Sequence, residues 1–191
     1  MSRAYRLKVS ESCRRVLRGS DHVSTQLEIL DVLPREAMAN LLAKELVAQG
    51  FEEECEGEYA RTENGVTVRV VAATGEVIVE AEVSSEEEIE VSRTGSYFDE
   101  TNQKQREELK KNLEQQAEEA LEDEAQRREQ KLVNKATDQL EQALTDVQGE
   151  LNKVVNRVTA TALKQKAAQL GEIKEMTEDE ETGSLTIVLE V

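Results

Sequence analysis

Apolar and polar residues alternate near the start of this chain. In YRLKV, the side chains of Tyr5, Leu7 and Val9 share one face, and TQLEIL repeats the alternation up to Leu30. A period of two predicts strands. Between the two runs, GSD (residues 19–21) supplies turn residues, so we expect two strands joined by a turn, with His22 at that turn.

The period then changes to that of a helix. In DVLPREAMANLLAKELVAQGF, apolar residues recur every three or four positions, at Met38, Leu41, Leu42 and Leu46. This spacing predicts an amphipathic helix that begins near Pro34. Gly50 is placed to cap its C-terminus, and Phe51 is expected to fold back onto the last turn.

Alternation returns after this helix and predicts a meander. Asn64-Gly65 is a strong hairpin signal, and Thr74-Gly75 marks a second turn. The strands VTVRVV and EVIVEAEV carry valines on one face and polar residues on most positions of the other. We therefore expect an antiparallel sheet with one buried and one wet face. EEEIEV, with Ile89 and Val91, is expected to form a further edge strand.

From about residue 99 to residue 170 the chain reads as helix. It holds no proline and one glycine, Gly149, and its apolar residues recur in steps of three and four. This narrow stripe is of the coiled-coil type. The stripe lapses between Leu121 and Leu132, where EDEAQRREQK offers only Ala125.

The chain ends on GSLTIVLEV, which reads as a strand preceded by another strand and an acidic turn. A lone two-stranded hairpin is at best marginal in water, so these strands are expected to join a sheet. We therefore predict that the helical region reverses within residues 122–150 and that the C-terminal strands return to the sheet begun by residues 4–91. The alternative is a straight rod that dimerises and places its hairpin on a second copy.

These expectations define an α+β fold with an antiparallel or mixed sheet and one packing helix. A long helical coiled-coil hairpin interrupts the sheet. The predicted domains are residues 1–95 (the first part of the sheet), residues 99–170 (the helical arm) and residues 171–191 (the hairpin that completes the sheet). The arm is also a candidate surface for homodimerisation.

The charge is strongly negative, with 41 acidic and 24 basic residues and a net charge of −17. This balance argues against nucleic acid or an anionic membrane as the main partner. Residues 51–91 hold thirteen acidic and two basic residues. Glu80 and Glu82 are therefore candidate contacts for a basic protein partner. A solvated face whose charges prevent edge-to-edge aggregation explains the same pattern.

Two of the five aromatic residues, Tyr97 and Phe98, are adjacent where the sheet gives way to the arm. They are either a plug at the base of the helix or an exposed anchor for a partner.

The chain offers few candidate catalytic residues. His22 is the single histidine, Cys13 and Cys55 form no C-x-x-C pair, and no phosphate-binding loop occurs. We expect no cofactor and no metal, and the TEDEETG turn lacks the spacing of a calcium loop. A thiol enzyme that uses Cys13 or Cys55 with His22 stays open as an alternative. No signal peptide or membrane span is expected, and reduced thiols suit a cytoplasmic protein.

The segments MSRAYRLKVSES, QLEILDVLPREAMANLLAKELVAQGF and ETGSLTIVLEV together resemble a family of small bacterial accessory proteins. Members of that family are encoded beside AAA+ ATPases of the FtsH or MoxR type, in ternary systems. The resemblance implies a non-enzymatic interaction or adaptor protein that works with such an ATPase, and it supplies no functional residues. A self-associating coiled-coil scaffold is the structural alternative.

Overall fold

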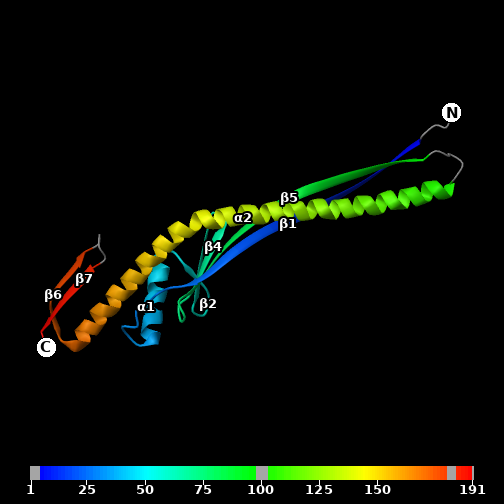
Figure 1. Cartoon of the computed structure of the whole chain (residues 1–191). Coiled ribbons are helices and arrows are strands. Elements are labelled where there is room, and N and C mark those ends of the chain that lie inside the picture. The colour runs from blue at the N-terminus through cyan, green and yellow to red at the C-terminus, as the bar shows by residue number, and fades with distance from the viewer. Residues whose placement is uncertain (1–4, 98–102, 180–183, 191) are drawn as a thin grey trace. The chain divides into compact units, whose positions relative to one another are not determined.

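The computed structural model describes residues 5–97, 103–179 and 184–190. Its elements are β1 (Tyr5–Gln26), α1 (Arg35–Ala48), β2 (Glu52–Cys55), β3 (Glu58–Glu63), β4 (Val66–Val71), β5 (Glu76–Tyr97), α2 (Gln103–Leu170), β6 (Glu172–Asp179) and β7 (Ser184–Glu190) (Figure 1). Five strands form an antiparallel sheet in the order β1-β5-β4-β3-β2, and β6 and β7 form a second sheet. The predicted α+β class is confirmed.

The chain divides into two compact units. The first comprises residues 1–20 and 82–136, and the second comprises residues 21–81 and 137–191. Strands β1 and β5 and helix α2 each contribute residues to both units. The three predicted domains, residues 1–95, 99–170 and 171–191, stay a prediction.

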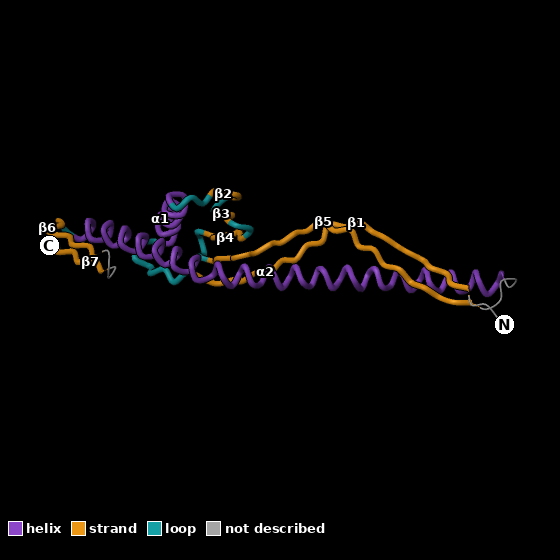
Figure 2. The backbone as a smooth tube through the Cα atoms, turned by 90° about the horizontal axis from the view of Figure 1, so that it is seen from above, coloured by secondary structure: helices purple, strands orange, loops and turns teal. Residues whose placement is uncertain are grey.

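The first unit is a two-stranded ribbon packed on a helix. Odd-numbered residues of β1 and β5 face the N-terminal part of α2, and Figure 2 shows the two strands running alongside that helix. One cluster joins Leu17 and Ile89 to Leu121 and Ala125 of α2. A second joins Val9 to Leu113 and Ala117. The predicted helical stripe is therefore buried here by strands of the same chain.

The expected turn at residues 19–21 is wrong, because β1 continues through it as one strand. Gly19 serves close packing: a Cβ atom there would lie 2.2 Å from the backbone nitrogen of Val133 and 2.3 Å from the carbonyl carbon of Leu132. Only a residue without a side chain allows the strand to approach the helix so closely. The second expected strand is also misplaced, because Leu27 to Leu30 follow β1 rather than forming a strand.

Strand β5 is likewise longer than expected. Ile89 and Val91 belong to the same strand as Val77 and Val79, and they do not form a separate edge strand. The alternation of inward odd positions continues without a break through the polar residues between them, which include Glu87. The acidic run EEE therefore leaves the alternation of the strand unchanged. This alternation is the main sequence signal of a strand.

In the second unit, α1 forms as predicted. Met38, Leu42 and Leu46 are buried on its inner face. Gly50 adopts a φ of +85°, and the backbone N–H of Phe51 donates to the carbonyl of Leu46 at 3.0 Å. This reversal after the helix is the glycine C-cap that the sequence indicates, and it buries the ring of Phe51.

The hairpins of the second unit also form where the sequence places them. Asn64 and Gly65 have φ angles of +52° and +80°, as a two-residue hairpin turn requires. Beyond the turn, Val68 pairs with Val79 and Val70 with Val77 in the β4–β5 ladder. These four valines are buried, which confirms the predicted buried face.

The predicted reversal of the helical region within residues 122–150 is wrong. Helix α2 runs without interruption from Gln103 to Leu170. Residues 122–131, where the apolar stripe is interrupted, stay helical because Glu, Gln, Arg and Lys are good helix formers. Arg128 is held there by Glu87 of β5 at 2.6 Å and by Glu124 at 3.0 Å. Gly149 costs a helix only about 1 kcal/mol relative to alanine.

The predicted return of the C-terminal strands to the first sheet is also wrong. β6 and β7 pair with each other in a separate antiparallel sheet, in which Met176 lies opposite Ile187. The prediction followed from the marginal stability of lone hairpins. That rule concerns stability, and it does not identify which surface a hairpin joins.

Candidate interaction surface

The wet face of the sheet in the second unit is built by the alternation that buries the valines. Thr67 and Arg69 lie between Val66, Val68 and Val70 along β4, so they project to the opposite face. Thr62 of β3 is opposite Thr67, and Ile78 of β5 is opposite Arg69. We call this surface the outer face and define it by Glu54, Thr62, Thr67, Arg69 and Glu80.

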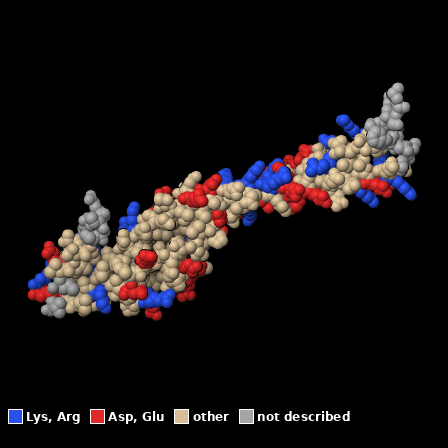
Figure 3. All heavy atoms as spheres, in the orientation of Figure 1, with Lys and Arg blue, Asp and Glu red and all other residues tan. Residues whose placement is uncertain are grey.

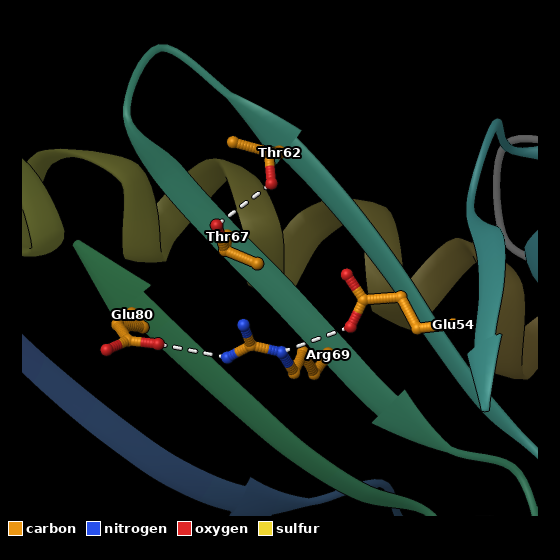
Figure 4. Close-up of polar contacts among 5 residues, drawn as sticks. All are labelled: Glu54, Thr62, Thr67, Arg69 and Glu80. Atoms are coloured by element: carbon orange, nitrogen blue, oxygen red, sulfur yellow. Dashed lines mark hydrogen bonds and ion pairs between the residues drawn. The ribbon is translucent and has the colours of Figure 1, made fainter. Parts of the chain in front are cut away.

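Arg69 is the centre of the outer face. Its Nη1 donates to Oε2 of Glu80 at 2.9 Å, and its Nε donates to Oε2 of Glu54 at 3.4 Å. Figure 4 shows the guanidinium between these two carboxylates, on the side of the sheet away from the helix behind it. The hydroxyls of Thr62 and Thr67 are hydrogen bonded at 2.9 Å. One cation from a central strand thus links strands on both sides of it.

The electrostatics of this cluster keep Arg69 charged. The hydrogen bond to Glu80 raises the pKa of Arg69, and partial burial opposes that shift. The side chains of Arg69 and Glu80 are 40% and 37% exposed. Ion pairs with this degree of exposure contribute about 0–1 kcal/mol. Glu80 is therefore engaged, but a competing cation could displace Arg69 at little cost.

Glu82, the second acidic candidate, belongs to the first unit. Its carboxylate lies 3.9 Å from Nη1 of Arg18, and Arg14 lies 2.8 Å from Glu86 on the same ribbon. Figure 3 shows basic and acidic side chains interspersed on the visible face of this unit. Two pairs between β1 and β5 thus offset part of the acidic charge on the solvated face of the ribbon.

Tyr97 lies at the end of the same ribbon, where its ring stacks on that of Tyr5. The ring centroids are 5.5 Å apart and the planes make an angle of 26°. Such stacking holds an aromatic side chain in a defined position. Phe98 lies outside the described residues.

The two cysteines and the histidine lie on strands, Cys13 and His22 on β1 and Cys55 on β2. Cys13, in the first unit, packs against the Leu17 cluster, and its sulfur accepts a hydrogen bond from Arg15 at 3.1 Å. Cys55 is exposed in the second unit. The backbone N–H of His22 donates to Asp21 at 2.9 Å. The thiol-enzyme alternative is untested by these contacts.

Sequence reasoning missed Arg69 and Glu54 as parts of one cluster. Arg69 is one of two basic residues among residues 51–91, and a cation surrounded by so many acidic residues is a signal for an ion-pair centre. Glu54 could not be assigned in the same way, because β2 pairs with β3 across an irregularity between Glu53 and Cys55. That irregularity changes which side chains face outward.

Within the part of the chain that the structure describes, no group of three or more His, Cys, Asp or Glu side chains is arranged to hold a metal ion. The same residues include no helix long and apolar enough to cross a membrane.

The fold and this surface define an α+β protein with an acidic sheet face organised by a central arginine. The chain belongs to the family described as FtsH ternary system domain X5, whose model matches residues 1–191. This membership confirms the resemblance to an accessory family of FtsH-associated systems. The chain matches no curated protein and no solved structure.

Proposed function

We propose that this chain is a non-enzymatic accessory component of an FtsH-type AAA+ system and that it binds a protein of that system. The family match along residues 1–191 is the observation that carries this proposal. The family is described as a domain of an FtsH ternary system, and a component of such a system would need a surface for its partners.

The outer face is the docking surface that we propose. Its two carboxylates, Glu54 and Glu80, share one guanidinium in pairs that are weak enough to exchange. A basic segment of a partner would compete with Arg69 for them. Glu82 and Tyr97 belong to the first unit, so each is proposed as a separate partner contact and not as part of this docking surface.

Binding of the purified full-length chain to each protein encoded beside it, the ATPase included, tests this proposal. We expect one of them to bind with an affinity that falls as salt rises. The double variant Glu54→Gln/Glu80→Gln should weaken that complex by about tenfold. Glu36→Gln, on the exposed first turn of α1, is the matched control and should bind normally.

Two outcomes would contradict different parts of the proposal. If no neighbouring protein binds at about 50 µM, a concentration that detects weak complexes, the accessory role is wrong. If one binds and the double variant binds equally well, the accessory role stands and the outer face is the wrong surface.

The scaffold alternative has less support. The stripe of α2 that would form a coiled coil is buried at Leu121, Leu140 and Val154 within the two units. A homodimer through the arm and a cytoplasmic location both stay predictions.

A further inference from the structure

A groove lies in the second unit between the β3–β4 hairpin and α2, on the sheet face opposite the outer face. Its volume is about 410 Å³, within the range of about 300–1,000 Å³ that ligand clefts span. The strands and their turn form one wall, which includes Arg61, Glu63 and Val68, and α2 forms the other, which includes Gln139, Asp146 and Glu150.

The floor of the groove is aliphatic. Val66, Val68 and Val147 are 7%, 4% and 9% exposed, so they present small apolar surfaces at the bottom. Such a floor favours an occupant with a hydrocarbon stem, because burial of methylene groups against apolar side chains is favourable.

The groove's own cation is already engaged. Arg61 forms an ion pair with Glu150 across the groove and donates to the carbonyl of Gln49 at 3.2 Å. Its guanidinium carbon also lies 4.9 Å from the centroid of the Phe51 ring. These contacts fix Arg61 and use its charge.

Two other carboxylates of the lining have no such partner. Glu63 is exposed on the strand side and Asp146 is exposed on the helix side. Across residues 5–97, 103–179 and 184–190, neither forms an ion pair. With Arg61 and Glu150 cancelling each other, the lining carries a net charge of −2. A cation bound between the two walls would offset this charge.

We propose that the groove binds a lysine side chain presented by a partner protein. The stem of lysine would lie on the valines, and its ammonium would reach Glu63 and Asp146 at the rim. An ammonium can take acceptors from two walls because its three N–H donors do not lie in one plane, unlike those of a guanidinium. The amide oxygens of Gln139 and Gln142 are further acceptors on the helix wall. This assignment rests on the proposed function in so far as the partner is a protein.

The direct test uses two short probes and the full-length chain. Acetyl-Ala-Lys-Ala-amide is titrated into isotope-labelled protein, and backbone amide shifts are followed by NMR. The neutral probe has norleucine, which keeps the same hydrocarbon stem, in place of lysine. We expect the lysine probe to shift amides that line the groove, including Asn64, Val68 and Ala143, and to bind at least about fivefold more tightly than the neutral probe.

Variants then separate this groove from the outer face. Glu63→Gln/Asp146→Asn should weaken the lysine affinity measured at the groove amides at least about fivefold, whereas Glu54→Gln/Glu80→Gln, which alters the opposite sheet face, should leave the affinity at those amides unchanged. Equal affinity for the two probes, an absence of groove shifts, or an unchanged affinity of the groove variant would each overturn the assignment. If the lysine probe does not bind in the groove but a neighbouring protein binds the chain, the accessory role stands and only the groove assignment is wrong. If the lysine probe binds in the groove and no neighbouring protein binds the chain, only the accessory role is wrong.

Discussion

Two antiparallel strand pairs in this chain differ in how their apolar faces are covered. In the ribbon of the first unit, Leu17 of β1 and Ile89 of β5 are 1% and 0% exposed beneath α2. In the C-terminal hairpin, Met176 of β6 is 40% exposed, and Leu185 and Ile187 of β7 are only half-buried. The sequences alternate in the same way, so alternation specifies strands without specifying what covers them.

The difference shows where the stability of a strand pair comes from. Burial of a valine or leucine side chain contributes about 1.5–3 kcal/mol. The ribbon repeats that gain along α2 at Val9, Leu17 and Ile89. We therefore expect perturbations of the ribbon to be severe and equivalent perturbations of the hairpin to be mild.

The largest effect should come from Gly19→Val. The added side chain would meet backbone atoms of Leu132 and Val133 closer than 2.5 Å, and backbone cannot rotate away. We expect a loss of about 3 kcal/mol or more in the free energy of unfolding, measured by urea denaturation. Gly149→Ala is the control, because no described atom outside its own stretch of helix lies within 4 Å of the added Cβ. It should gain about 1 kcal/mol. A Gly19→Val protein of normal stability would show that the strand does not pack on the helix at this point.

The next largest effect should be the difference in stability loss when one apolar side chain is truncated in the ribbon and one in the hairpin. Leu17→Ala removes a buried side chain and should cost about 2–4 kcal/mol. Met176→Ala removes one that is 40% exposed and should cost about 1 kcal/mol or less. Urea denaturation of the two variants gives the comparison directly. Equal losses would mean that the hairpin is as well covered as the ribbon.

The same contrast explains which parts of the fold the sequence could predict. Helix α1 and the two turns at Asn64-Gly65 and Thr74-Gly75 follow from local signals, since capping and positive φ angles depend on neighbouring residues. The continuation of β1 through Gly19 depends on Leu132 and Val133, which are more than a hundred positions away. Local rules assign such a glycine to a turn.

The predicted helix reversal is wrong for a related reason. Its only basis is the need of the C-terminal strands for a sheet, whereas nothing within residues 122–150 breaks a helix strongly. For the outer face, charge identified Glu80, but its ion pair with Arg69 depends on register. Register between strands is set by pairing and turns together, and composition does not contain it.

Hydrogen exchange of the unaltered chain should show a difference in amide protection between the ribbon and the C-terminal hairpin. Amides between β1 and β5 in the first unit are expected to open only with the ribbon–helix core. Amides of β6 and β7, including those of Met176 and Ile187, need less apolar surface to be exposed before they open. We expect exchange in the hairpin to be at least about 100-fold faster at neutral pH. Equal protection in the two pairs would contradict the difference in burial.

The smallest effect should be a dependence of the ribbon's stability on pH in the acidic range. The hydrogen bond from Arg128 lowers the pKa of Glu87 below its usual value of 4.5, with a further lowering by Ser85. A carboxylate whose pKa is lowered in the folded state stabilises that state at pH values above 4.5, and this contribution is lost as the pH falls through the lowered pKa. Arg128→Met should therefore lower the melting temperature at pH 7, and the difference from the unaltered chain should shrink in acid.

The matched control for that titration lies in the hairpin. Lys174 pairs with Glu190 at 2.8 Å, with both side chains more than half exposed. Because exposed pairs of this kind contribute little, Lys174→Met should leave the melting temperature unchanged at neutral and at acidic pH. A difference for Arg128→Met that stays constant from neutral pH to below the pKa of Glu87 would mean that Arg128 acts through packing alone. A pH-dependent difference for Lys174→Met would contradict the expectation that the exposed Lys174–Glu190 pair contributes little.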